Sequence, residues 1–387
     1  MPAGLFPGPG KATRTGMNKR TFSVICALGL VLLLKGPAPA QNKNDDLLTY
    51  SDRGRKAAIT SRSQLEVRRQ QILDSMQSAM GKLPALKGNP PFQVSYRDTI
   101  NENAYTRYTI TLTVAPGEEI AAYLYFPRKR PGQTRFPAMV ALHGTDVLGK
   151  MAVDGQGSRK EPWIRKNLGY GKELAERGYV VIAPDYPGFG DAKGHDFAAD
   201  RYTSGSMKAI FNQMRCVDLL QTLDTVDPGR IGIIGHSLGG HNAIFTGAFD
   251  DRLQVVVSSC GWTLMDYYDV GEKAIQRYGA RLGPWSQELY MPLLREKYKL
   301  EPERFPFDFD EVMVAIAPRA FFSCSPLRDA NFDYHGVEKG IANVMPLYRM
   351  LKAEDKLRVQ YPDDVHDFPY ETRQEAYRFI DSILKKP

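Results

Sequence analysis

Short apolar runs alternate with amphipathic segments over most of the chain. From Phe136 onward, six runs rich in β-branched and aromatic residues are separated by stretches with helical periodicity. The six runs read AMVALHG, YVVIAPD, RIGIIG, LQVVVSSC, RAFFSCS and LRVQYP. Strands that alternate with helices in this way indicate a parallel sheet with helical crossovers. The helices are expected at residues 163–177, 207–225, directly after Ser237, 336–353 and 370–385.

Two further runs, YTRYTITLTV and IAAYLYFP, lie on either side of the turn Pro116-Gly117 and alternate between apolar and polar positions. They predict an antiparallel pair of strands. Upstream, four apolar residues recur on one helical face and predict a helix that packs on the domain: Leu65, Ile72, Met76 and Met80. We therefore assign a linker and helix to residues 41–91 and the main domain to residues 92–387.

One segment, residues 262–305, interrupts the alternation between two predicted core strands. It is rich in aromatic residues and is a candidate lid over a site. Four of its aromatic residues are expected to line a pocket: Trp262, Tyr267, Tyr268 and Trp285. Packing of the insertion on the body of the domain explains the same aromatic residues equally well.

The first 40 residues have the composition of a targeting segment. Asn18-Lys19-Arg20 precedes the apolar run Phe22–Leu34, which is followed by the small residues of GPAPA. This order predicts a secretory signal peptide cleaved after Ala40, because the apolar run is too short to span a bilayer. Met17, directly before the basic residues, is an alternative start of translation. We expect a secreted or periplasmic protein without a stable membrane anchor.

The formal charge of +7 is concentrated in the predicted signal peptide. Residues 1–40 hold five basic residues and no acidic one, so removing them from +7 leaves +2. A nearly neutral chain gives no reason to expect nucleic acid as a partner. Export implies an oxidising compartment, but Cys216, Cys260 and Cys324 are too few for a disulfide framework. Buried free thiols are expected, with a Cys260–Cys324 bridge as the alternative.

The segment Arg230–Phe245, RIGIIGHSLGGHNAIF, carries the most specific chemical signal. Its centre has the pattern Gly-x-Ser-x-Gly at residues 235–239, between a β-branched run and a segment that can form a helix. A sharp strand-to-helix turn of this kind presents a nucleophilic serine, here Ser237. The alternative is a glycine-rich turn with an incidental serine.

A serine nucleophile needs a histidine base and an acid that orients the base. His366 directly follows the run LRVQYP and precedes the last predicted helix, which is the position expected for the base. The acid is expected in the loop after RAFFSCS, where Asp329 is the first candidate and Asp333 the second. Either carboxylate could instead cap the next helix. His335, in the same loop, is expected to be a loop residue.

The oxyanion of an acyl-transfer intermediate needs two backbone N–H donors. We expect them from Leu238, which follows the nucleophile, and from Thr145, in the loop after AMVALHG. His143, His236 and His241 are expected to be packing or hydrogen-bonding residues. No spacing of cysteine, histidine and carboxylate residues resembles a metal site, and no phosphate-binding motif is present, so no metal or cofactor is expected.

With elbow, acid loop and histidine loop in this order, the chain resembles the α/β-hydrolase superfamily. The resemblance is greatest to the branch of dienelactone hydrolases, acetyl xylan esterases and the catalytic domain of prolyl oligopeptidases. VDPGRIGIIGHSLGG, FDFDEVMVAIAPRAFFSCSPLRDANFD and HDFPYETRQEAYRFID carry it. It implies a mostly parallel eight-stranded sheet with helices on both faces, and a triad of Ser237, Asp329 and His366.

Two departures from this branch affect the function. Dienelactone hydrolases have a cysteine nucleophile, whereas this chain has Ser237. Prolyl oligopeptidases have an N-terminal β-propeller, for which the residues between Gln41 and Phe92 are too few. We therefore expect an exported serine esterase that cleaves a small-molecule or carbohydrate ester through an acyl-enzyme. A serine peptidase with the same triad and a non-catalytic hydrolase-fold binding module are the alternatives.

Overall fold

The computed structural model describes residues 46–85, 93–129 and 134–385. The predicted signal peptide therefore lies outside the described residues. Within the described part of the chain, no helix has the length and apolar character needed to cross a bilayer.

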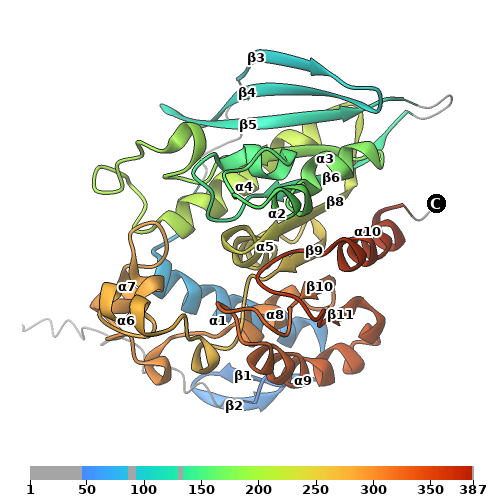
Figure 1. Ribbon diagram of the computed structural model, residues 1–387. Helices are drawn as coiled ribbons and strands as arrows, with labels where there is room; N and C mark the ends of the chain where they lie inside the picture. The colour runs from blue at the N-terminus through green and yellow to red at the C-terminus, as the bar shows by residue number, and fades with distance from the viewer. Residues whose placement is uncertain (1–45, 86–92, 130–133, 386–387) are drawn as a thin grey trace, which may run out of the picture. The chain divides into compact units, whose positions relative to one another are not determined.

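A nine-stranded sheet forms the centre of the domain, with the strand order β11-β10-β9-β8-β6-β7-β5-β4-β3. Strands β6 to β11 are parallel to one another, and β3, β4 and β5 continue the sheet in antiparallel pairing (Figure 1). The expectation of a mostly parallel sheet is confirmed. The strands are β3 (Val94–Asn101), β4 (Tyr105–Ala115), β5 (Glu118–Pro127), β6 (Phe136–Leu142), β7 (Val180–Pro184), β8 (Val226–His236), β9 (Leu253–Ser259), β10 (Ala320–Cys324) and β11 (Leu357–Gln360).

The expected number of eight strands is corrected to nine by β3. This strand has the sequence VSYRDTIN, and all of its residues except Val94 are exposed. An edge strand that buries almost nothing needs no apolar alternation, so the periodicity that predicts the other eight strands is absent from it.

Helices cover both faces of the sheet, as expected. Helices α4, α5, α8 and α9 lie on one face, and α3 and α10 lie on the other (Figure 1). The helices are α1 (Arg62–Met80), α2 (Pro162–Asn167), α3 (Tyr170–Glu176), α4 (Gly205–Thr222), α5 (Leu238–Phe249), α6 (Glu272–Tyr278), α7 (Leu293–Glu296), α8 (Phe309–Ile316), α9 (Tyr334–Met350) and α10 (Tyr370–Leu384). The single helix expected at 163–177 is divided into α2 and α3 at Leu168-Gly169.

Alternation along β6 shows why these strands are apolar throughout. Ala138 and Val140 belong to the core under α4 and α5, whereas Met139 and Ala141 belong to the core under α3 and α10. A strand covered on both faces has no solvent-facing positions, so it appears in the sequence as a continuous apolar run.

The N-terminal region contributes a helix and a small hairpin. Strands β1 (Thr49–Asp52) and β2 (Arg55–Ala58) pair antiparallel within the segment expected to be linker. The apolar positions predicted on one face of α1 are all buried. Arg68 of α1 also forms a buried ion pair with Glu311 of α8 at 2.6 Å, so α1 is fixed to the helical layer of the domain.

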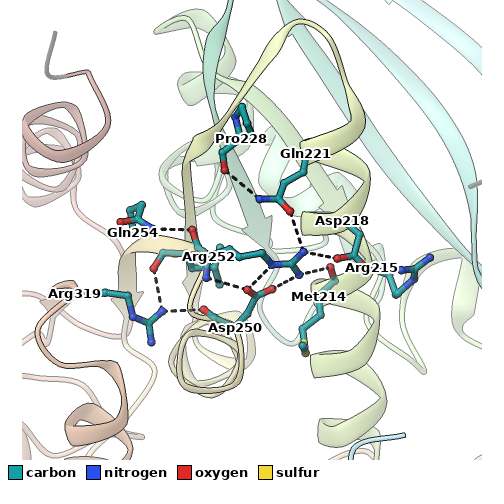
Figure 2. Close-up of polar contacts among 10 residues, drawn as sticks. Met214, Arg215, Asp218, Gln221, Pro228, Asp250, Arg252, Gln254 and Arg319 are labelled. Atoms are coloured by element: carbon teal, nitrogen blue, oxygen red, sulfur yellow. Dashed lines mark hydrogen bonds and ion pairs between the residues drawn. The ribbon is translucent and has the colours of Figure 1, made fainter. Parts of the chain in front are cut away.

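A polar cluster around Arg252 joins α4, the turn after α5 and the residue before β10 (Figure 2). The guanidinium of Arg252 donates to both carboxylate oxygens of the buried Asp250, at 2.8 and 2.7 Å, and also to Asp218 of α4. Arg319 donates to the backbone carbonyl of Asp250 at 2.8 Å. Because this cluster lies at the amino ends of β9 and β10, it stabilises the end of the sheet opposite Ser237.

Candidate active site

Ser237 lies between β8 and α5 in a backbone conformation that non-glycine residues rarely adopt, with φ 55° and ψ −116°. The flanking glycines make this turn possible. A Cβ at Gly235 would lie 2.2 Å from the carbonyl oxygen of Gly239, and a Cβ at Gly239 would lie 2.1 Å from that of Leu142. Strand and helix therefore pass too closely for any side chain, and the strain concentrates at the serine, as in nucleophile elbows.

The loop after β6 packs directly against this elbow. A Cβ at Gly144 would lie 3.2 Å from the carbonyl oxygen of His236 and 3.5 Å from Cβ of Ser237. His143 holds the loop, since its Nδ1 bonds the carbonyl of Gly144 at 2.6 Å and its Nε2 accepts from the N–H of Tyr186 at 3.0 Å. Thr145 is thereby placed beside Ser237, and it lines the same cavity as Ser237 and Leu238.

The structure brings Asp329 and His366 into direct contact. Nδ1 of His366 lies 2.9 Å from both carboxylate oxygens of Asp329, whose side chain is 1% exposed. The backbone N–H groups of Asn331 and Phe332 donate to Oδ1 of Asp329 at 2.8 and 3.2 Å. These bonds fix the carboxylate, which in turn holds the imidazole with Nδ1 protonated.

Asp333, the second candidate for the acid, has a different role. Its side chain accepts from the N–H of His335 at the start of α9, and it also contacts Nδ1 of His335 at 2.8 Å. The sequence left open whether each carboxylate contacts the histidine or caps the next helix. In the structure, Asp333 caps α9 and Asp329 contacts His366.

The imidazole of His366 contacts two other rings. The ring centroid of His236 is 4.9 Å away, and the ring of Phe332 is stacked on the imidazole at 6.1 Å with an interplanar angle of 25°. Nε2 of His366 is buried and has no hydrogen-bond partner among the described residues. No side chain or backbone group among the described residues therefore occupies this nitrogen.

Three other histidines near the site are buried and held in the neutral form. Burial lowers the pKa of His143, lowers that of His236 well below its usual value and lowers that of His241 to about 3. His366 is a second and smaller cause for His236. Nδ1 of His236 lies 3.1 Å from the hydroxyl of Ser259, consistent with the hydrogen-bonding role expected from the sequence.

A cavity of about 290 Å³ opens at Ser237. Tyr268 and Trp285 of the insertion line it, as expected, but Trp262 and Tyr267 do not. Trp262 donates to the hydroxyl of Ser323 at 2.9 Å within the core, and Tyr267 packs against Gly336 of α9. The aromatic lining is Phe189, Tyr268, Tyr278, Trp285, Tyr290 and Phe332, and among the described residues no charged side chain takes part.

His241 also lines the cavity, and the sequence analysis expected it only to pack or form hydrogen bonds. It lies in the first turn of α5, and its backbone N–H donates to the carbonyl oxygen of Ser237 at 3.1 Å. Its position in the first turn of the helix that begins directly after Ser237 is the signal that could have identified it.

Cys260 lies behind the Asp329–His366 pair, and the three side chains place one donor atom each within 4.8 Å of one another. They do not suit a metal ion, because Nδ1 of His366 is already bonded to Asp329 and burial raises the pKa of the Cys260 thiol. Sγ of Cys260 contacts the carbonyl of Asp367 at 3.1 Å. Cys260 and Cys324 are free thiols in this structure.

A protein family and several curated relatives match the chain. The family described as "Alpha/beta hydrolase family" matches residues 139–377, more than half of the chain. YtaP of Bacillus subtilis (strain 168) is 28% identical over 287 residues, which cover 71% of this chain and 87% of that protein. A 4-O-methyl-glucuronoyl methylesterase of Hypocrea jecorina (strain QM6a) is 27% identical over 160 residues, or 38% of this chain and 33% of that protein.

Solved structures share the fold. A glucuronoyl esterase from Solibacter usitatus superposes with a TM-score of 0.68 at 18% identity, over 90% of this chain and 98% of that chain. At this level of identity, the similarity concerns the arrangement of strands and helices.

Proposed function

The chain belongs to the alpha/beta hydrolase family, and we propose that it is an exported serine hydrolase of carboxylic esters, with a carbohydrate ester as substrate. The observation that carries the proposal is the strained elbow at Ser237, whose preceding residue His236 packs against His366. Nδ1 of His366 is held by Asp329, and its Nε2 is unpaired among the described residues. Nucleophile, base and orienting acid are the parts that acyl transfer requires.

In the proposed reaction, the hydroxyl of Ser237 attacks the ester carbonyl while Nε2 of His366 takes its proton. The Asp329 carboxylate stabilises the imidazolium through Nδ1. His366 then protonates the departing alcohol, which leaves the acyl group on Ser237. Water attacks this acyl-enzyme with His366 again acting as base, and the carboxylic acid is released.

The oxyanion formed in both steps is proposed to bind the backbone N–H groups of Leu238 and Thr145. Leu238 is the first residue of α5, where backbone N–H groups have no acceptor within the helix. The positive end of the helix dipole adds to the stabilisation of a negative charge at this point.

Esters are favoured over peptides by the relatives. Two of them are named for glucuronoyl ester cleavage, and one of these covers nearly the whole chain in its fold. Export is proposed from the basic and apolar pattern of residues 1–40.

The test uses acetyl, feruloyl and glucuronoyl esters and a peptide series, with the wild type and Ser237→Ala assayed side by side. We expect ester hydrolysis by the wild type, and at least a 10⁴-fold lower kcat for Ser237→Ala. A fluorophosphonate should label Ser237 in the wild type and in Ser382→Ala, a control on α10, but not in Ser237→Ala. Equal turnover by the wild type and Ser237→Ala would exclude the serine mechanism, and cleavage of peptides alone would identify a peptidase.

A further inference from the structure

His241 is a buried polar side chain without a polar partner. It is 3% exposed and lines the cavity at Ser237, and neither of its ring nitrogens has a hydrogen-bond partner among the described residues. Its neighbours are aromatic, with ring centroids at 4.9 Å for Trp285, 5.6 Å for Phe245 and 5.7 Å for Tyr290. Leaving buried polar atoms unpaired is costly, so such a group calls for a ligand that pairs with it.

Trp285 adds a second unpaired group to the same cavity. Its indole Nε1 is buried and has no partner among the described residues. The remaining polar groups of the lining are neutral, and include the side chains of Thr145, Gln287 and Asn331. The cavity thus combines aromatic walls with neutral hydrogen-bonding groups, and within the described residues it offers no charge to balance an ion.

We propose that this cavity holds an uncharged six-membered ring that bears hydroxyl groups, and that His241 is the residue that recognises those hydroxyls. The proposal rests on the proposed function, since the ring is part of the ester that Ser237 attacks.

The chemistry of the imidazole supports a hydroxylated ring. Neutral imidazole has one donor and one acceptor nitrogen, and a hydroxyl group can both accept and donate a hydrogen bond. Burial lowers the pKa of His241 to about 3, so it offers no positive charge to an anion at neutral pH. A purely apolar ring would fill the aromatic walls but leave His241 and Trp285 unpaired. A ring with apolar faces and hydroxyl edges satisfies both requirements.

The first experiment compares two esters that differ in their ring hydroxyls. The methyl ester of methyl α-D-glucuronoside and methyl cyclohexanecarboxylate share a six-membered ring and a methyl ester, but only the first carries hydroxyl groups. We expect the wild type to prefer the first by about a hundredfold or more in kcat/KM, because a site built to pair hydroxyl groups rejects the analogue that lacks them. Equal kcat/KM for the two esters would overturn the inference and leave the esterase function intact.

Variants of His241 test the residue itself. His241→Leu should lower the preference for the hydroxylated ester at least tenfold, and His241→Asn, which keeps neutral donor and acceptor atoms, should restore most of it. His335→Leu replaces an exposed histidine in the first turn of α9 and serves as the matched control, with the preference of the wild type. Unchanged preference in a folded His241→Leu protein, checked by its melting temperature, would assign His241 to packing alone.

A binding measurement keeps this inference separate from catalysis. In the Ser237→Ala background, calorimetry should detect binding of the glucuronoside methyl ester. The free glucuronoside acid should bind at least tenfold more weakly, because the described residues that line the cavity include no cation. Adding His241→Leu should weaken binding of the methyl ester by a similar factor. Failure of the wild type to cleave any ester would exclude the proposed function, while this titration would still report on ring recognition. Equal or tighter binding of the free acid would contradict the inference.

Discussion

The imidazole of His236 lies against the imidazole of His366, with ring centroids 4.9 Å apart and an interplanar angle of 58°. His236 directly precedes Ser237, so the residue next to the proposed nucleophile also supports the proposed base. Burial keeps His236 neutral by lowering its pKa. It can therefore pack against His366 without repelling the imidazolium that the proposed acyl transfer would form.

This contact predicts that His236 keeps His366 in position by packing of its ring, and that its ring nitrogens are not needed for this. His236→Phe retains a ring beside His366 and should keep kcat/KM for 4-nitrophenyl acetate within about tenfold of the wild type. His236→Ala leaves a gap that lets His366 move, and should lower kcat/KM by about 100-fold, the typical cost of a misplacement of about 1 Å. An equal loss of kcat/KM in the two variants would contradict this. It would indicate that the hydrogen bond between His236 and Ser259 is the important contact.

The two carboxylates of the acid loop should differ sharply in their effect on turnover. Asp329→Asn should lower kcat by about 10⁴-fold, because the amide no longer holds Nδ1 of His366 in the protonated form. Asp333→Asn preserves a good helix cap and should stay within about twofold of wild-type kcat. Initial rates with a saturating ester decide the matter, and a comparable loss in both variants would contradict the assignment.

Buried neutral histidines make stability fall in acid. The pKa of His241 is about 3 in the folded protein and 6.5 when unperturbed, so between these values only the unfolded chain binds the proton. Its contribution is fully present above pH 6.5 and is lost as the pH falls toward 3. His143 and His236 shift in the same direction.

The measurement is the free energy of unfolding of the wild type and His241→Asn in urea from pH 7 to pH 4. The wild type should lose about 1.4 kcal/mol more per pH unit than the variant below pH 6. Parallel curves for the two proteins would show that His241 is protonated in the folded state.

Gly239 should tolerate no side chain. A Cβ there would lie 2.1 Å from the carbonyl oxygen of Leu142 and 2.7 Å from that of His143, and neither backbone atom can move without displacing β6. Gly239→Ala should cost about 3 kcal/mol or more of unfolding free energy. Gly194, which has open space around it and an ordinary φ, is the matched control, and Gly194→Ala should leave the melting temperature within about 2 °C. A stable Gly239→Ala protein would contradict the packing at the elbow.

The features that could be predicted from the sequence are those that depend on a short local pattern of residues. Buried strands, the elbow and the order of the acid and histidine loops all follow from short motifs, and the structure places Asp329 against His366. Strand β3 has no apolar alternation because both of its faces are exposed. Cavity lining depends on the path of an irregular insertion in three dimensions, so a list of its aromatic residues could not separate Trp285, in the cavity, from Trp262, in the core.

The insertion, residues 262–305, is also in contact with the N-terminal helix α1. The hydroxyl of Tyr298, within it, contacts that of Ser78 on α1 at 2.8 Å, and α1 packs on α7 and α8. We therefore expect that a chimera designed to carry the substrate choice of this chain onto a relative must transplant residues 62–80 together with residues 262–305. Grafting the insertion alone would separate the cavity wall from the helix that supports it.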